Sequence, residues 1–190
     1  MNRGMKNVLM AGVAAIALGF AGTARAELIT NGSFEGGLSP WTLQNLGVDY
    51  DYEFVTNFGF SGTNSVRFGH GATANTSLFQ NVAISAGESY HFSMWVYNNG
   101  VGDDELIVRS FKNGSWQEDY AMGIVPTGLE SWGEFTIDFT ANFDADELWI
   151  QGRDQIATYY VDDVSLTVVP GPASATLLGV GGLAWLRRRR

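Results

Sequence analysis

The sequence contains no cysteine, so a disulfide framework and thiolate chemistry are both excluded. It has only two histidines, and neither a Gly-x-Ser-x-Gly nucleophile turn nor a His-Glu-x-x-His zinc motif occurs. Glycoside hydrolysis would need two positioned carboxylates, whereas the acidic runs at 103–105 and 144–147 are typical of solvated loop edges. The sequence therefore predicts a protein that is not an enzyme.

Positive charge is also scarce outside the two ends of the chain. Of the 11 Lys and Arg residues, seven lie in the segments 1–26 and 187–190. Residues 27–169 keep four of them against all 20 carboxylates, which gives a net charge of −16. Because phosphate binding needs clustered Lys and Arg, this composition excludes nucleic acid and anionic membrane surfaces as partners. It favours divalent cations and neutral ligands.

The segment 1–26 has the three parts of a secretory signal peptide. These are a basic start with Arg3 and Lys6, an apolar run at 8–20, and a small-residue cleavage site at Ala24 and Ala26. Cleavage after Ala26 would make residue 27 the first of the mature chain. We therefore expect an exported protein.

The tail, 169–190, forms a second segment outside the folded domain. Pro170, Gly171 and Pro172 precede an apolar run at 173–186, and four arginines end the chain. The apolar run is shorter than the roughly 20 residues that cross a bilayer, and the arginines would stay on the cytoplasmic side. Two interpretations remain open: a segment held in the inner membrane only until an enzyme removes it, or a weak permanent anchor.

This tail resembles the PEP-CTERM sorting signal of Gram-negative bacteria, which has a Pro-Glu-Pro-like motif, a short hydrophobic helix and a terminal arginine cluster. Gly171 stands where that motif usually has Glu. The resemblance implies processing by an exosortase and release or attachment at the cell surface, often in strains that make exopolysaccharide.

The middle of the chain is rich in β-forming residues, separated by Gly, Asn and Asp. No window long enough for a helix shows a 3.6-residue period there. We expect an all-β domain over residues 27–168, a single jelly-roll β-sandwich between an N-terminal signal helix and a short C-terminal hydrophobic helix. The expected strands are 40–45, 51–56, 64–70, 76–84, 88–97, 104–111, 115–122, 133–140, 146–152 and 157–168.

Alternation along two of these strands assigns side chains to faces. In 88–97 the set at 90, 92, 94 and 96 is core-like, and in 146–152 the set at 148 and 150 is core-like. The opposite faces combine aromatic rings with hydrogen-bonding groups, which is what a sugar needs. The predicted ligand-binding residues are Trp95, Tyr97, Trp149, Gln151 and Arg153. The alternative is that the tryptophans pack beneath neighbouring loops.

Asp162 in the last expected strand is a carboxylate predicted to lie among apolar side chains. Strict alternation places it on one face with Tyr160, Val164 and Leu166, which is the apolar side. An unpaired carboxylate there would be costly, so it needs a partner. A cation with oxygen ligands would serve, and so would backbone N–H groups or an arginine such as Arg67.

Four segments resemble carbohydrate-binding modules of the family 4, 9 and 22 type. They are 31–35 (Asn-Gly-Ser-Phe-Glu) with Trp41, 61–67 (Ser-Gly-Thr-Asn-Ser-Val-Arg), 132–135 (Trp-Gly-Glu-Phe) and 160–164 (Tyr-Val-Asp-Asp-Val). The resemblance implies a galactose-binding-like jelly roll with a structural calcium ion (Ca²⁺). Its implied ligands are the Ser33 carbonyl, the Glu35 and Asp162 carboxylates, and backbone oxygens of the loop from Gly62 to Ser65.

Two hypotheses for function follow. In the first, the chain is an exported module that binds polysaccharide, including the cell's own matrix. In the second, it is a structural or adhesion protein of the surface without sugar binding. Sugar-binding members of the resembled families often carry an aromatic at the start of the strand that here reads 75–78 (Asn-Thr-Ser-Leu). Either the platform lies on other strands here, or this copy keeps the scaffold without the ligand.

Overall fold

The computed structural model describes residues 25–45, 52–68, 76–98, 105–124, 130–153 and 159–170. Residues 1–24 of the expected signal segment, which include Ala24, and residues 171–190 of the tail, which include Gly171 and Pro172, lie outside these ranges, so cleavage of the signal segment and processing of the tail both remain predictions. The described residues include no helix, and therefore none of a length and apolarity suited to crossing a membrane.

The described part of the chain forms ten strands, whose ends all lie close to those expected from the sequence. β-Branched and aromatic residues are frequent in most of them, as expected for pleated, half-buried surfaces. The strands are β1 (Thr42–Asn45), β2 (Tyr52–Thr56), β3 (Asn64–Phe68), β4 (Thr76–Ile84), β5 (Ser89–Asn98), β6 (Glu105–Lys112), β7 (Ser115–Ile124), β8 (Trp132–Thr140), β9 (Ala145–Arg153) and β10 (Tyr159–Val169).

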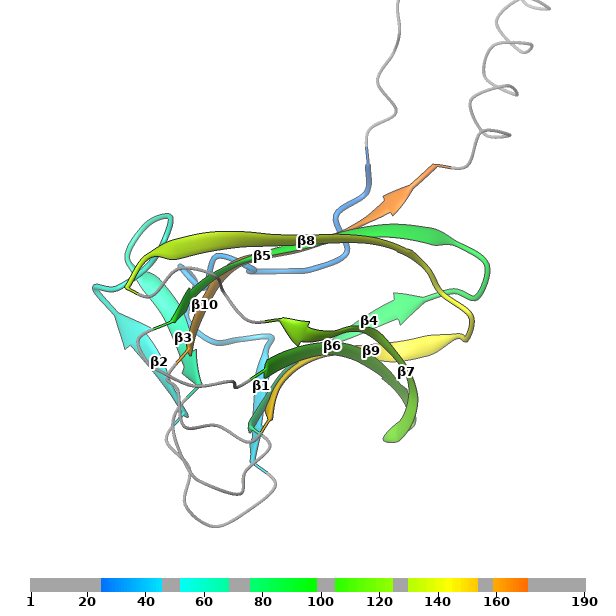
Figure 1. Ribbon diagram of the computed structural model, residues 1–190, viewed down its shortest axis with the longest axis horizontal. Helices are drawn as coiled ribbons and strands as arrows, with labels where there is room; N and C mark the ends of the chain where they lie inside the picture. Colours follow the sequence, from blue (N-terminus) through cyan, green and yellow to red (C-terminus); the bar gives the residue numbers. More distant parts are fainter. Residues whose placement is uncertain are drawn as a thin grey trace, which may run out of the picture.

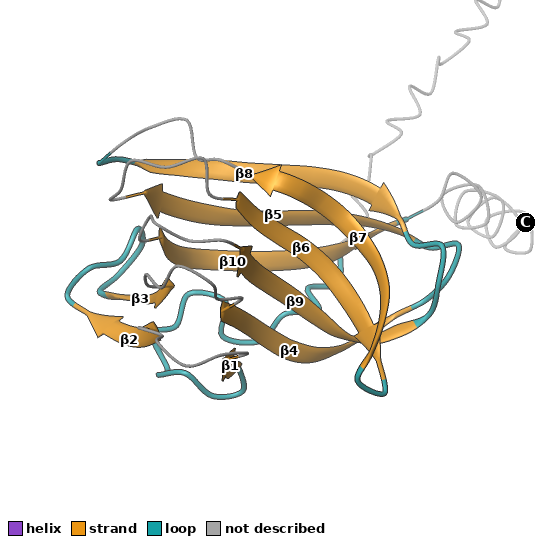
Figure 2. Cartoon of the chain, turned by 60° about the horizontal axis from the view of Figure 1, so that its bottom comes forward, coloured by secondary structure: helices purple, strands orange, loops and turns teal. Residues whose placement is uncertain are grey.

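These strands make two five-stranded antiparallel sheets, in the orders β1-β4-β9-β6-β7 and β2-β3-β10-β5-β8 (Figures 1 and 2). Strands adjacent in sequence are often in different sheets: β4 and β5 are one such pair. The all-β jelly-roll sandwich expected from the sequence is confirmed.

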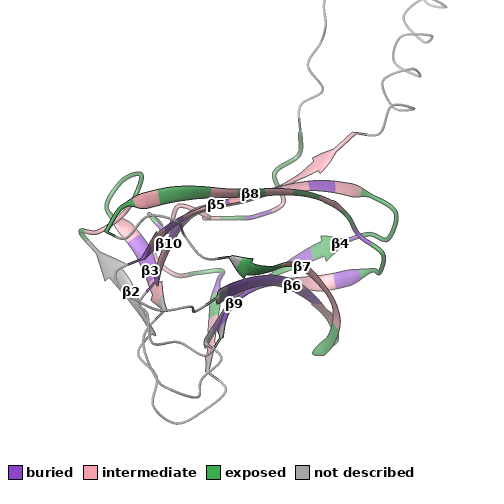
Figure 3. Cartoon of the chain, in the orientation of Figure 1, coloured by how far each residue is buried: buried purple, intermediate pink, exposed green. Residues whose placement is uncertain are grey.

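The core lies between the two sheets and follows the expected alternation. Tyr90, Phe92, Met94 and Val96 of β5 are at most 2% exposed. From the other sheet, residues at 148 and 150 face them and are fully buried. Each such apolar side chain contributes roughly 1.5–3 kcal/mol on leaving water. Figure 3 shows buried positions along β6 and β9, and exposed ones along the edge strand β8.

The sheet β1-β4-β9-β6-β7 is strongly bent, and its outer surface lies on the inside of the bend (Figure 1). We call this surface the curved face. Strand twist and coiling produce such curvature, and it brings side chains from several strands toward one another.

The two ends of the described domain lie together. Glu27 forms a bridge with Thr167 of β10, and the Leu28 N–H donates to the Leu166 carbonyl at 2.8 Å. The Glu27 carboxylate also accepts from the backbone N–H groups of Ile29 and Leu166. Both ends therefore leave the sandwich at the same corner (Figure 1).

Candidate functional site

The curved face carries aromatic side chains on four adjacent strands. Trp149 points away from the core, since the residues on either side of it in β9 belong to the core. Cross-strand pairing sets Phe79 of β4 opposite Trp149, and Phe111 of β6 opposite Trp116 of β7. We call these four residues the aromatic row.

Within the aromatic row, Trp149 is enclosed and Trp116 is open. The Trp149 ring lies 4.5 Å from that of Phe79, nearly parallel to it, and 4.3 Å from that of Phe111. Trp149 is only 6% exposed, and its indole N–H donates to Glu147 Oε2 at 2.8 Å. Trp116 is 56% exposed. The ring most available to a ligand on this face is therefore that of Trp116.

A hydrogen-bonded network lies beside the aromatic row. Arg109 of β6 donates through Nη1 to Gln151 Oε1 at 2.5 Å and through Nη2 to Asp119 Oδ2 at 3.1 Å. Its Nε lies 2.8 Å from Asp119 Oδ1, which also accepts from the Trp116 indole N–H at 3.0 Å. Arg109 and Asp119 are each about one-fifth exposed in their side chains. The network thus fixes a guanidinium, an amide and a carboxylate in place next to an exposed indole.

The five predicted ligand-binding residues do not form one site. Trp149 and Gln151 share the curved face, as alternation predicted, and Arg153 ends the same strand, with a side chain that is not described. Trp95 and Tyr97 belong to β5 in the other sheet and face away from the core there. The two groups consequently lie on opposite sides of the sandwich.

Several residues of the curved face were missed by the sequence interpretation: Arg109, Phe111, Trp116 and Asp119. The sequence did contain a signal for them. Asn113 and Gly114 have positive φ angles of 51° and 71°, and this tight turn pairs the residues flanking it, which sets Phe111 opposite Trp116. Counting outward from a recognised hairpin turn would have found the exposed tryptophan.

The outer side of the other sheet holds a second group of rings, which we call the aromatic face. Phe60, from the loop between β2 and β3, stacks on Trp95 with ring centroids 3.5 Å apart and planes 8° apart. Phe58 of the same loop lies against three rings, at 4.9 Å from Tyr97, 5.7 Å from Trp132 and 4.6 Å from Tyr160. The aromatic face comprises Phe58, Phe60, Trp95, Tyr97, Trp132 and Tyr160.

Asp162 lies directly beneath that loop and is 0% exposed. Its Oδ2 accepts from the backbone N–H groups of Phe60 at 2.7 Å and Ser61 at 3.2 Å, and its Oδ1 accepts from that of Asp163 at 2.7 Å. Burial raises the pKa of Asp162 from 3.8 to about 6, against these three hydrogen bonds, which favour the ionised form. Of the partners considered for this carboxylate, the structure shows the backbone N–H groups.

The expected face of Asp162 was wrong in part. Asp162 is paired with Trp95 on the outer side of the sheet, together with Tyr160, whereas Val164 and Leu166 are in the core. A β-bulge between positions 162 and 165 adds a residue to β10 and exchanges inside for outside beyond it. Asp162 is buried because a loop covers it, and not because it faces the core.

Glu35 holds the other half of the same loop. Its Oε1 accepts from the N–H groups of Thr63 and Asn64, both at 2.8 Å, and these bonds lower the pKa of Glu35. Gly62 lies at φ +81°, and a Cβ there would be 2.6 Å from Glu35 Cδ. Only glycine fits between the loop and this carboxylate.

The predicted calcium ligands therefore lie around one loop, but the loop turns N–H groups toward both carboxylates where carbonyl oxygens were expected. Ser65 lies in β3, buried, and donates its hydroxyl to the Phe58 carbonyl, while Ser33 lies in the turn before Phe34. Among the described residues, no three or more His, Asp or Glu side chains gather to hold a metal. The calcium ion stays a prediction.

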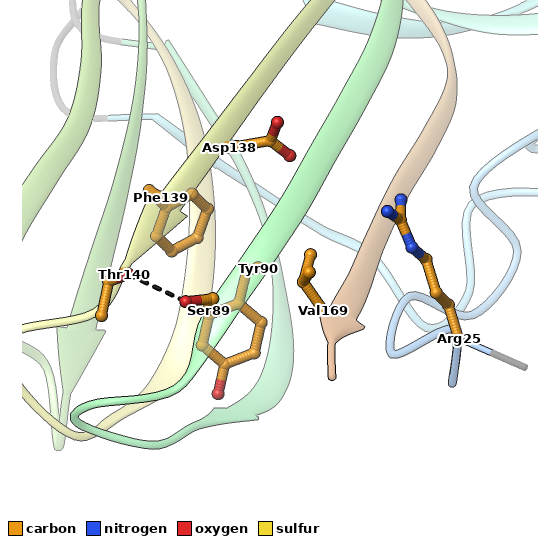
Figure 4. A pocket seen from close by; sticks show the side chains of 7 residues that line it. All are labelled: Arg25, Ser89, Tyr90, Asp138, Phe139, Thr140 and Val169. Carbon is orange, nitrogen blue, oxygen red and sulfur yellow. Dashed lines mark hydrogen bonds between the residues drawn. The ribbon is translucent and has the colours of Figure 1, made fainter. Parts of the chain in front are cut away.

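A pocket of about 380 Å³ opens near the two ends of the described domain (Figure 4). Tyr90, Asp138 and Phe139 line one side, and Val169 and Arg25 the other. Because the predicted cleavage would remove Arg25, this pocket would lose one wall in the mature chain. We do not assign a ligand to it.

Comparison with solved structures supports the fold. The N-terminal xylanase 10B modules of Clostridium thermocellum, solved with xylohexaose, match with a TM-score of 0.59 and 22% identity over 77% of this chain and 29% of that one. TmCBM61 in complex with β-1,4-galactotriose gives 0.53 and 18%, over 76% and 99% of the two chains. Tailspike protein 4 of bacteriophage CBA120 gives 0.57 and 14%, over 75% of this chain and 21% of that one.

Among curated proteins, no sequence matches this one. The family model described as a carbohydrate-binding domain, of the family 4 and 9 type, matches residues 26–151, which is most of the folded part. This match and the jelly-roll sandwich agree with the resemblance noted in the sequence. The chain belongs to this family of carbohydrate-binding domains.

Proposed function

We propose that the domain is a non-catalytic module that binds a polysaccharide across its curved face. The observation that carries the proposal is the exposed Trp116 ring, held beside the Arg109–Gln151–Asp119 network. A ligand site typically combines apolar contact area with a few fixed polar groups, and the curved face offers both. Aromatic rings stack against the C–H faces of a pyranose, and the amide, guanidinium and carboxylate groups bind its hydroxyls.

The structure also favours a ligand that is a chain of sugars over a single sugar. The aromatic row crosses four strands from β4 to β7, so it spans a surface several sugar units long and not a closed cavity. Arg109 is neutralised by Asp119, which removes the one described guanidinium on this face as a site for an acidic sugar. We therefore expect a neutral glycan.

Affinity electrophoresis in gels that contain xylan, β-1,4-galactan or mixed-linkage β-glucan tests the proposal. Trp116→Ala should weaken binding by about tenfold or more, as expected for the loss of an exposed aromatic anchor. Phe143→Ala is the matched control, because Phe143 is 52% exposed in the loop between β8 and β9, outside the aromatic row. Equal migration of the Trp116→Ala variant and the wild type in a gel that retards both would contradict the assignment.

A structural role without sugar binding is the competing function, and the enclosure of Trp149 favours it. Trp149 is held between two phenylalanine rings, as a packing residue would be. A folded protein that binds no polysaccharide in the panel would support this second function.

We further propose that the module is exported and that an exosortase processes its tail, which leads to cell-surface attachment or release. The signal-peptide pattern and the Pro-x-Pro, apolar and arginine segments of the tail support this proposal. Intact-mass measurement of the exported protein tests it. The expected mass corresponds to a chain that begins at Glu27 and ends near Val169 or Pro170. A chain that still carries Arg190 would instead identify a membrane anchor.

Finally, we propose that Ca²⁺ stabilises the loop from Phe58 to Asn64. The Glu35 and Asp162 carboxylates each accept three hydrogen bonds there, which leaves each with one further acceptor position for a hard cation. Ca²⁺ should raise the melting temperature of the wild type, and chelator should lower it again. Identical melting curves in Ca²⁺ and in chelator would exclude the ion.

A further inference from the structure

The aromatic face has properties that a packing role alone does not require. Its outermost ring, Phe60, is 40% exposed and covers Trp95 in a parallel stack. Trp132, at 6.0 Å from Phe60, is half-buried beside it. The result is a broad aromatic surface open to solvent at one end of the β5–β8 pair.

Hydrogen-bonding groups continue from the aromatic face along the same two strands. Trp95 is paired with Glu134, and the next pair along the strands whose side chains face away from the core is Ser93 with Thr136. Beyond them, His91 Nδ1 lies 2.7 Å from Asp138 Oδ1, and the Ser89 and Thr140 hydroxyl oxygens are 2.9 Å apart. Side chains on one face of a strand repeat at about 7 Å, so these groups form a row that leads away from the rings. We call this row, which comprises residues 89, 91 and 93 of β5 and 134, 136, 138 and 140 of β8, the polar track.

The charges around the polar track limit what can lie on it. Among the described residues on this side, three carboxylates, those of Glu134, Asp138 and Asp163, carry more negative charge than Arg67 carries positive charge. Arg67 lies opposite Tyr160 on the same side of the sheet. An anionic sugar, a phosphate group or an anionic lipid would be repelled. A neutral polyhydroxyl chain suits both halves, since its rings can stack on Phe60 and Trp132 and its hydroxyls can bond to the polar track.

We propose that the aromatic face and the polar track of β5 and β8 form a second binding site for a neutral polysaccharide, so that one domain binds two glycan chains and cross-links them. The two sites belong to different sheets and face in opposite directions. Each can therefore be occupied without blocking the other. The second site does not depend on binding at the curved face.

Light scattering with soluble long-chain xylan and mixed-linkage β-glucan tests the cross-linking. A protein with two sites should raise the scattering at intermediate protein concentration and lower it again in excess protein, when every site holds a separate chain. Phe60→Ser and Trp116→Ala, each removing one exposed ring, should both abolish this maximum while affinity electrophoresis still shows binding. Phe143→Ser is the matched control for Phe60→Ser and should scatter as the wild type does.

A second variant separates ligand contact from loop folding. Thr136→Lys places a bulky side chain on the polar track at an exposed position and leaves every ring of the aromatic face in place. In a Trp116→Ala background it should reduce the remaining affinity by about tenfold, whereas Ser85→Lys in an exposed loop should not.

Complete loss of binding in the single Trp116→Ala variant would overturn the second site, and wild-type binding without a scattering maximum would overturn the cross-linking. Sedimentation analysis tests whether a second copy of this chain, and not a glycan, occupies the aromatic face. A concentration-dependent dimer that Phe60→Ser dissociates would assign the aromatic face to a second copy of this chain and overturn the proposal. Absence of binding to every polysaccharide in the panel would contradict both glycan sites, whereas loss only in Thr136→Lys and Phe60→Ser would contradict the curved face alone.

Discussion

Replacement of Asp162 by alanine should destabilise the domain strongly, and much more than a change at the half-exposed Asp163 beside it. The carboxylate is fully buried and accepts three backbone hydrogen bonds, two of them from the loop that carries Phe60. Asp162→Ala leaves three N–H groups without their acceptor, and an unsatisfied buried group costs roughly 1–3 kcal/mol. Because the loop can partly relax toward water, we expect a loss of about 3–5 kcal/mol in the free energy of unfolding.

Urea unfolding at pH 7.5 in chelator measures this loss without any contribution from Ca²⁺. At about 3 °C per kcal/mol for a domain of this size, thermal unfolding should shift by roughly 9–15 °C. Asp163→Asn is the matched control: Asp163 is half-exposed, has φ 47°, which Asn tolerates, and accepts one side-chain hydrogen bond from Ser61. A loss below about 1 kcal/mol for Asp162→Ala, or one equal to that of Asp163→Asn, would refute the reasoning.

Three further predictions concern stability. In chelator, the folded pKa of Asp162, at about 6, lies above its unfolded value of 3.8, so the extra stability that its neutral form provides is fully present below pH 3.8 and is lost as the pH rises through 6. The three backbone hydrogen bonds to the ionised carboxylate remain above pH 6, and urea midpoints should show the fall in the wild type and not in Asp162→Asn. Gly62→Ala should cost at least about 1–2 kcal/mol in thermal unfolding, because the new Cβ meets Glu35 at a positive φ. Gln80→Leu should cost roughly 1–3 kcal/mol in urea, since the Gln80 amide, 3% exposed, bonds both the N–H and the carbonyl of Thr30 at 2.8 Å; an unchanged midpoint would show that this link contributes nothing.

The sequence predicted the strands and the faces within a strand well, because both depend on local alternation. In β5 every described position falls on the side that the two-residue period assigns, and the core positions of β9 do so too. The same reasoning failed at Asp162, where one extra residue in β10 exchanges the two sides. A bulge leaves little trace in the pattern of apolar residues, so alternation alone could not reveal it.

The grouping of residues into sites could not be predicted from the sequence, for a different reason. Trp95 and Trp149 each sit beside hydrogen-bonding neighbours, and nothing local states that their strands belong to different sheets. That assignment depends on which strands pair across long separations in the chain. The position of Phe60 over Trp95 likewise depends on a loop held by Glu35 and Asp162, which come from opposite ends of the domain's sequence.

The placement of β10 determines how the domain would carry mechanical load. β10 lies in the middle of its sheet, between β3 and β5, and its last residues lead directly into the tail. A pull between a bound polysaccharide and the tail would act along β10, so its hydrogen bonds to both neighbours would be strained together in shear. By contrast, the short bridge at Glu27 runs antiparallel to the end of β10, and traction on both chain ends would open it one bond at a time. A tether through the tail alone would therefore load a central strand that is hydrogen-bonded on both sides.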